Sequence, residues 1–254
     1  MKITFLGTGT SVGVPAVGCE CATCLSDDPR DKRLRTSVLV EEAGHQLLID
    51  ASTDFRQQAL RIGLKKLDAI LLTHAHADHC FGLDDARPLM FRHGAIPVYA
   101  TGETWQGLRR IYAYVFEPAA YPGVPRIIPH TLEGDFELCG LPIEPLVVIH
   151  GKLPVTAFRI GEFAYVTDCN RIPDETCERL QGLEVLVIDA LRFKPHPTHM
   201  ALDEALRYIE RLRPRRALLT HISHDIQHAV TSAQLPAGVE IAYDGLSVEM
   251  MREA

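Results

Sequence analysis

Four side chains of metal-binding type fall within six residues of this 254-residue chain. They are His74, His76, Asp78 and His79. The apolar run 67–73 directly before them predicts a buried strand that ends at the cluster. Because alternate residues of a strand point the same way, His74 and His76 can hold one ion if the backbone stays extended past residue 73. Asp78 and His79 are then expected to face elsewhere, where they suit a second ion.

Such a pair of ions has a known chemical use. Two metal ions about 3.5–4 Å apart form the clamp that hydrolyses phosphate esters. The cluster therefore predicts a metal-dependent hydrolase. The alternative, a run of surface histidines, is disfavoured because four ligand-type residues at these offsets directly follow a buried-type strand.

The composition favours one compact domain over residues 1–254. Hydrophobic residues make up 46% of the chain, which is enough for a core, and neither a linker nor a repeat divides it. The formal net charge of −7 weighs against a partner such as long nucleic acid, which needs a broad basic face. A small anionic substrate stays compatible with this charge, since metal ions and a few local basic residues can hold it.

The termini and cysteines predict a cytoplasmic protein without a membrane anchor. The apolar start 1–6 is too short for a signal peptide, and no run reaches membrane-spanning length. Without an export signal, the seven cysteines are expected to be thiols or metal ligands and not disulfides.

The hydrophobic pattern predicts sheets covered by helices, an α/β layered architecture. Hairpins are expected for 36–41 with 45–50, for 155–160 with 163–167, and for 240–243 with 246–250. Further strands are expected over 3–6, 67–73, 97–100, 146–149, 184–189 and 216–220, and helices over 55–62, 83–91, 103–116 and 202–212.

Three more ligand-type residues each end a predicted strand: His150, Asp168 and His221. Loops after strands can display such residues on one rim. Any one of them alone could equally be a hydrogen-bonded loop residue. Together with the first cluster they supply the ligands that two coordination spheres need.

The ordered set of these residues resembles the metallo-β-lactamase fold hydrolases over nearly the whole chain. The resemblance implies a four-layer αβ/βα sandwich with a dinuclear centre. One ion would be held by His74, His76 and His150, and the other by Asp78, His79 and His221. Asp168 would bridge them, and Asp50 would be a carboxylate that orients a ligand or the nucleophilic water.

A second metal site is predicted by the CxCxxC element of Cys19, Cys21 and Cys24. Three close thiolates need a fourth ligand for a closed tetrahedral site. His224, three residues after His221, is the expected fourth ligand, so this set resembles the PhnP-like branch, which has an extra Cys₃His zinc site. The alternatives are reduced thiols in a loop and, with less support, an iron–sulfur site. The other four cysteines are expected to be small buried residues.

His199 resembles a position at which PhnP-like enzymes contact the substrate phosphate. An imidazole can protonate a departing alkoxide, typically for a rate gain of about 10²–10⁴. His199 is therefore a candidate general acid, and its alternative role is that of a residue near the start of helix 202–212.

These residues predict a dinuclear metal-dependent phosphodiesterase that acts on a small phosphodiester by attack of a metal-bridged hydroxide. The PhnP-like resemblance implies that this phosphodiester is cyclic. The catalytic metals are expected to be manganese or zinc, with iron as a further choice, and the structural metal zinc. The resemblance also implies a homodimer. Segment 103–126 is longer than the resemblance to PhnP-like enzymes leads us to expect. It predicts a lid, a subunit contact or a core-packing helix with a loop.

Three rival functions remain open. One is an RNA-processing nuclease on the same fold, which the acidic chain disfavours. Another is a thioesterase or lactonase, since the same ions polarise carbonyl groups. The last is a metal-binding or scaffold protein without catalysis.

Overall fold

The computed structural model describes residues 1–117 and 122–250. The chain divides into two compact units, and each is described here by itself. The first unit comprises Met1–Gly7, Arg35–Glu133 and Gly245–Ala254, and the second comprises Thr8–Leu34 and Gly134–Asp244. The expectation of one domain over the whole chain stays a prediction.

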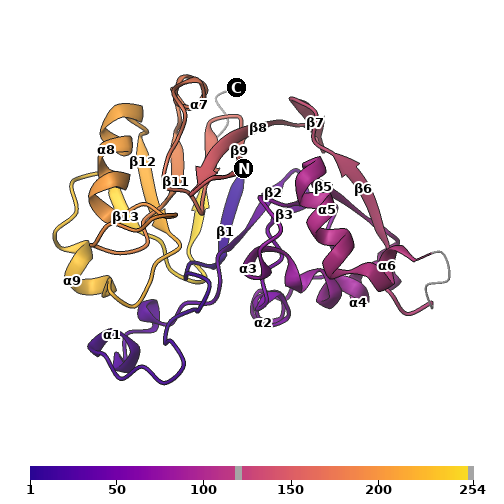
Figure 1. Cartoon of the computed structure of the whole chain (residues 1–254), viewed down its shortest axis with the longest axis horizontal. Coiled ribbons are helices and arrows are strands. Elements are labelled where there is room, and N and C mark those ends of the chain that lie inside the picture. Colours follow the sequence, from indigo (N-terminus) through magenta and orange to yellow (C-terminus); the bar gives the residue numbers. More distant parts are fainter. Residues whose placement is uncertain (118–121, 251–254) are drawn as a thin grey trace. The chain divides into compact units, whose positions relative to one another are not determined.

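A seven-stranded mixed sheet forms the first unit (Figure 1). Its order is β14 (Ser247–Glu249), β1 (Lys2–Gly7), β2 (Ser37–Glu42), β3 (His45–Ile49), β4 (Ala69–Leu71), β5 (Ile96–Ala100) and β6 (Ile127–Thr131). Strands β3 to β6 run parallel, so their carboxyl ends lie at the same edge. The segments that follow β3 and β4 therefore start side by side, which brings Asp50 next to the residues before His74.

Helices cover one face of this sheet. They are α2 (Phe55–Arg61), α3 (Ala77–Cys80), α4 (Arg87–His93), α5 (Gly102–Ile111) and α6 (Ala113–Phe116), with a 3₁₀ helix at Phe81–Ala86. The buried strand residues Leu48, Ile70 and Val98 share a core with Met90 of α4 and Trp105 of α5. Burying such side chains contributes about 1.5–3 kcal/mol each, which fixes the helices on the sheet.

The second unit has its own seven-stranded mixed sheet. Its order is β13 (Val239–Ile241), β12 (Arg216–Thr220), β11 (Val185–Asp189), β10 (Phe163–Val166), β9 (Leu153–Ile160), β8 (Leu141–His150) and β7 (Phe136–Leu138). Strands β10 to β13 run parallel, while β9 is antiparallel to both β10 and β8. Strands β8, β10, β11 and β12 consequently point the same way and end at the same edge.

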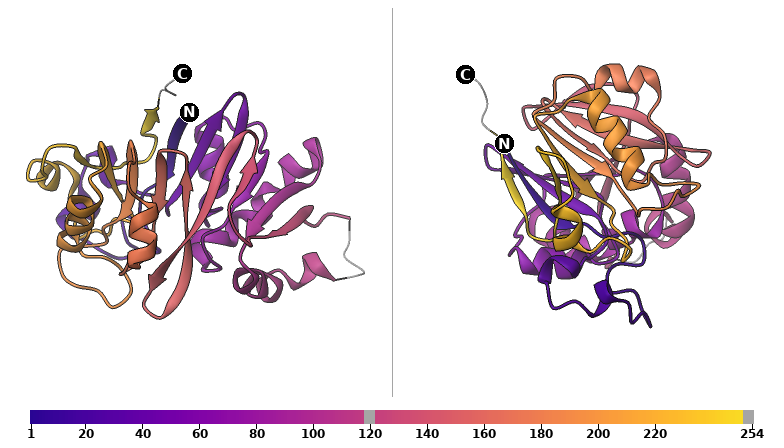
Figure 2. Two further views of the ribbon diagram at one scale, coloured as in Figure 1. Left: turned by 90° about the horizontal axis from the view of Figure 1, so that it is seen from above. Right: turned by 90° about the vertical axis from the view of Figure 1, so that its left-hand side faces the viewer.

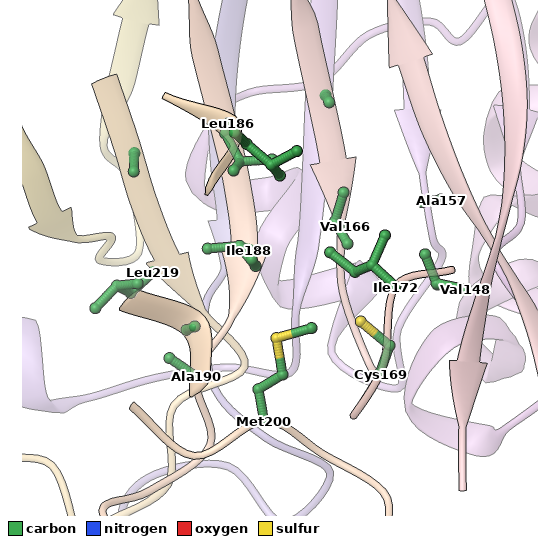
Figure 3. Close-up of a cluster of buried hydrophobic side chains, with 14 of the residues drawn as sticks. Val148, Ala157, Val166, Cys169, Ile172, Leu186, Ile188, Ala190, Met200 and Leu219 are labelled. Atoms are coloured by element: carbon green, nitrogen blue, oxygen red, sulfur yellow. The ribbon is translucent and has the colours of Figure 1, made fainter. Parts of the chain in front are cut away.

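The helices of the second unit are α1 (Ala22–Leu25), α7 (Asp174–Arg179), α8 (Leu202–Leu212) and α9 (His228–Ser232), with a 3₁₀ helix at Pro29–Asp31. Helices α7 and α8 cover one face of the sheet (Figure 2). Figure 3 shows the core beneath them, where Met200 and Cys169 lie among the aliphatic side chains of the strands. Helix α8 ends at Leu212 because Arg213 adopts a left-handed backbone with φ of 50° and Pro214 follows.

The expected α/β architecture of sheets covered by helices is confirmed. The hairpin expected at residues 240–250 is wrong, because β13 pairs with β12 whereas β14 pairs with β1 in the other sheet. The Asp-Gly pair there forms no hairpin turn: Asp244 accepts hydrogen bonds from Thr8 Oγ1 and the Leu34 amide. The strand expected at 67–73 is shorter, spanning Ala69–Leu71.

The helix expected at 103–116 is interrupted at Tyr112, whose hydroxyl donates to the Cys80 carbonyl. Trp105 and Leu108 of α5 are buried in the core, so α5 is a core-packing helix. Residues 118–121 of segment 103–126 lie outside the described residues, and its role as a lid or subunit contact stays a prediction. Over residues 1–117 and 122–250, none of the helices has the length and apolar character needed to traverse a bilayer.

Candidate active site

In the first unit, three histidine rings converge after β4. The centroids of His74 and His76 are 4.4 Å apart, and those of His74 and His79 are 4.2 Å apart. His76 keeps an extended backbone with φ of −71° and ψ of 153°, directly before α3 begins. The pairing of His74 with His76 therefore has the geometry that alternation along an extended segment predicts.

Asp78 and His79 lie close to each other, and their assignment to a second ion stays a prediction. The His79 Nε2 atom lies 3.3 Å from the Asp78 carboxylate. The reason is α3, a short helix missed from the sequence, which replaces the extended backbone from Ala77 onward. Its single turn brings the carboxylate and the imidazole together.

Asp50 lies behind His79 in the same unit. One carboxylate oxygen of Asp50 is 2.7 Å from His79 Nδ1, and the other accepts from the Thr73 amide at 2.9 Å. With Nδ1–H directed at Asp50, the Nε2 lone pair of His79 is left for a metal. Asp50 is fully buried and has φ of 63°, a left-handed conformation that is strained for an aspartate.

In the second unit, the shared strand edge gathers the other predicted ligands. The Asp168 Oδ1 atom lies 3.3 Å from His221 Nε2 and 3.8 Å from His150 Nδ1. Asp168 and His221 both have left-handed backbones, with φ of 59° and 60°. Such strain is a feature of functional positions that the surrounding structure holds in place.

His199 reaches the same place from the loop before α8. Its Nδ1 lies 2.9 Å from Asp168 Oδ1 and 3.2 Å from Asp189 Oδ2, and its ring stacks on that of His221. Burial alone would lower the pKa of His199, but the hydrogen bonds and charges of the two aspartates outweigh it and raise the pKa to about 10.

Asp189 is a site residue that sequence reasoning missed. It is fully buried at the end of β11, where Oδ2 accepts from the Cys169 amide at 3.0 Å and Oδ1 lies 3.9 Å from His221 Nδ1. The available signal was its place as the last residue of a predicted strand beside Asp168 and His221. Asp189, His199, Asp168 and His221 bring their ligand-type atoms within 4.8 Å of one another.

The three cysteines of the CxCxxC element meet His224 within the second unit. The His224 Nδ1 atom lies 3.1 Å from Cys19 Sγ, 3.4 Å from Cys21 Sγ and 3.6 Å from Cys24 Sγ. A tetrahedral zinc with usual bond lengths gives sulfur-to-nitrogen separations of about 3.6 Å. The donor set and its spacing therefore fit a closed tetrahedral metal site.

The thiols of this cluster differ in acidity. The backbone amide of Cys24 donates to Cys21 and lowers the pKa of the Cys21 thiol to about 6, whereas burial raises the pKa of Cys24 to about 11. A bound cation would favour the thiolate form of all three cysteines.

The family model described as beta-lactamase superfamily domain matches residues 45–222 of this chain. The chain belongs to the metallo-β-lactamase superfamily. A crystal structure described as a new diphosphatase from the PhnP family is 46% identical, with a TM-score of 0.92, and the match covers 97% of this chain and 96% of that one. Zinc-bound PqqB from Methylobacterium extorquens, 22% identical with a TM-score of 0.79, shares the fold over 98% of this chain and 100% of its own.

Two curated relatives of this chain carry other names. An octanoyltransferase of Porphyromonas gingivalis is 42% identical over 97% of this chain but only 51% of its own length, so the chain spans about half of that relative. Coenzyme PQQ synthesis protein B of Methylorubrum populi is 29% identical over 74% of this chain and 72% of its own. The PhnP-like resemblance and the class of metal-dependent hydrolase are confirmed by the family match and the diphosphatase structure.

Proposed function

We propose that this protein cleaves a phosphorus–oxygen bond in a small phosphate compound whose phosphorus carries two substituents, such as a cyclic phosphodiester. The observation that carries the proposal is the position of His199. It is held by Asp168 and Asp189 at the strand edge that also presents His150 and His221. A proton donor fixed beside metal ligands suits a reaction in which an alkoxide leaves.

The ligand set that the family resemblance implies is proposed to hold two divalent ions: His74, His76, Asp78, His79, His150, Asp168 and His221. When bound, the ions supply Lewis-acid polarisation of the phosphoryl oxygens and an activated water. Nitrogen and carboxylate donors suit manganese, zinc or iron. The cluster of Cys19, Cys21, Cys24 and His224 is proposed to hold a separate structural zinc.

The surrounding side chains orient the reacting groups. Asp50 fixes the ring of His79 through Nδ1. Asp168 and Asp189 engage Nδ1 of His199, which leaves its Nε2–H to donate a proton to the departing oxygen. Supporting carboxylates of this kind fix both the tautomer and the orientation of an imidazole.

A diphosphate linkage is the second candidate substrate. It is favoured by the 46% identity to the diphosphatase of the PhnP family over nearly the whole of both chains. The same donor and ligand arrangement suits both linkages, because in each an oxygen leaves phosphorus. The leaving group of a diphosphate is a phosphate, which depends less on a proton than an alkoxide does.

The test is a substrate panel with metal-defined protein: ribose 1,2-cyclic phosphate, bis(p-nitrophenyl) phosphate, a diphosphate-bridged dinucleotide and a short-chain thioester. His199→Gln is expected to lower kcat by about 10²–10⁴ on the cyclic phosphate. The loss on bis(p-nitrophenyl) phosphate should be much smaller, because p-nitrophenolate leaves without a proton.

His93→Gln, which changes an exposed histidine at the end of α4, is the matched control and should leave kcat unaltered on every substrate. Turnover of the thioester alone by fully metallated protein would contradict the proposal. An equal loss on both phosphodiesters would remove His199 from the role of acid.

A further inference from the structure

The loop between β11 and α8 carries a second histidine, His196, that the proposed mechanism does not use. We propose that His196 is a specificity residue: its Nε2–H donates a hydrogen bond to an oxygen atom on a substituent of the substrate phosphate, beside the proton donor His199. This inference rests on the proposed function and adds the class of substituent that the site selects, namely one that bears oxygen acceptors such as a sugar.

The ring of His196 extends a row of imidazoles outward from the ligand residues. Its centroid lies 5.1 Å from that of His199, which in turn lies 4.8 Å from the rings of His150 and His221. Among the described histidines, His196 has a ring contact with His199 alone. A substrate that reaches His199 with its leaving oxygen therefore meets His196 with the atoms beyond that oxygen.

Hydrogen bonds fix which nitrogen of His196 carries the proton. Its Nδ1 lies 3.4 Å from the backbone nitrogen of Thr198 and 3.2 Å from the Thr198 hydroxyl. A backbone N–H can only donate, so Nδ1 is the acceptor and the ring proton is on Nε2. Burial and the neighbouring charge of His199 lower the pKa of His196, which keeps the ring neutral. The ring thus offers a single donor without adding a charge.

Two prolines and an arginine restrict the conformation of the loop that carries His196. Pro195 and Pro197 flank the histidine and restrict the backbone on both sides. The guanidinium of Arg192 donates to the carbonyl oxygens of Lys194 at 3.1 Å and Pro195 at 2.9 Å. Arg192 therefore holds the backbone of this loop through two hydrogen bonds.

Thr198 ties the same loop to the strand end that carries His150. A Cβ atom added at Gly151 would lie 2.9 Å from Thr198 Cγ2, so the glycine lets the loop approach closely. A donor held on a braced loop loses little freedom on binding, which raises the selectivity that one hydrogen bond can give.

The test compares His196→Leu, which removes the donor, with His196→Gln, whose amide nitrogen can donate from the place of Nε2. On ribose 1,2-cyclic phosphate, the leucine variant is expected to lose about tenfold in kcat/KM, mainly through KM, and the glutamine variant to keep most of it. On bis(p-nitrophenyl) phosphate both should match the wild type. Equal losses on the two substrates, or glutamine no better than leucine, would overturn the proposal.

Ligand-binding measurements test the role of His196 independently of the proposed function. Calorimetry with metal-loaded protein should show ribose 5-phosphate weakened about tenfold by His196→Leu, while inorganic phosphate is unchanged. NMR of the ring nitrogens should report the Nε2–H tautomer of His196, and the opposite tautomer would refute the inference. A wild type that turns over no phosphate ester but shows this binding difference would refute the proposed function alone.

Discussion

Two clusters of metal-binding side chains lie in the same unit and are built differently. The cysteine cluster consists of thiols and one imidazole that face one another, with sulfur-to-nitrogen distances of 3.1–3.6 Å. The cluster around Asp168 consists of nitrogen and oxygen donors, and the buried carboxylate of Asp189 stands behind its histidines. Left-handed residues appear in the second cluster, at Asp168 and His221.

From this difference we expect the cysteine cluster to hold the fold and the cluster around Asp168 to do chemistry. A closed set of three thiolates and one imidazole leaves no position for a substrate, whereas histidines oriented by carboxylates beside a proton donor leave one. Changes in the cysteine cluster should therefore act on stability, and changes around Asp168 on turnover.

Asp168→Asn should have the largest effect. The amide would be a weaker metal ligand than the carboxylate and would also release His199, so kcat should fall by about 10³ or more. Steady-state assays on the best phosphate substrate, with metal analysis and a thermal melt, provide the measurement. A drop in melting temperature large enough to explain the lost activity by unfolding would contradict the division of roles.

Cys24→Ser should produce the opposite pattern. Loss of a ligand that joins the early loop to His224 should lower the free energy of unfolding by about 3–5 kcal/mol, because the crosslink closes a long loop. One zinc per chain should be lost, while kcat of the folded fraction stays close to the wild type.

Cys139→Ser is the matched control, since Cys139 is half-buried and lies outside the cluster. It should change neither zinc content nor the urea midpoint. A cysteine-cluster variant with normal stability and lost turnover would reverse the assignment of the two clusters.

The sequence predicted the cysteine cluster better than it predicted the surroundings of Asp168. Cys19, Cys21 and Cys24 are close in sequence, so they stay close in space and a short loop can bring all three to one ion. The place of Asp189 beside His221 follows from strand order, which hydrophobic patterns do not reveal. Its side chain is identified only once β11 is seen between β10 and β12.

Helices and strands were predictable where the hydrophobic periodicity is strong. Strand pairing was not predictable where the partner strand is distant in the sequence. Helix 202–212 and strand 216–220 match the structure residue for residue. Helix α3 was missed because four residues carry no periodic signal. The two final strands were paired wrongly because Asp-Gly is typical of a hairpin turn, while partners elsewhere in each sheet determined the outcome.

Asp189→Asn should have an intermediate effect that tests the supporting carboxylate. The variant keeps the shape but weakens the hold on His199 and His221, so kcat should fall by about 10–100-fold without loss of stability. Asp203→Asn, an exposed residue in the first turn of α8, is the control and should be neutral. A neutral Asp189→Asn would show that the aspartate serves only the Cys169 amide.

His228 should give the smallest effect, on the acid stability of the region that holds the cysteine cluster. Arg33 donates to His228 Nδ1 at 3.2 Å, and the His228 amide donates to Asp31 at 2.7 Å. Burial and the nearby charges of Arg33 and Arg30 lower the pKa of His228 from 6.5 to about 4. The charges of Asp28 and Asp31 raise this pKa, but by less. The folded protein therefore keeps this imidazole neutral where the unfolded chain takes up a proton.

The contribution of His228 is full above about pH 6.5 and is lost as the pH falls toward 4, because the unfolded state then binds more protons. Between pH 7.5 and 5 the wild type should lose about 1–2 kcal/mol more stability than His228→Asn, measured by urea unfolding. Asparagine keeps an acceptor near Nδ1 and cannot titrate. Repeating the pair in Cys24→Ser removes acid release of zinc as a cause. If the difference disappears there, the metal cluster alone holds this region and Arg33 with His228 adds nothing to it.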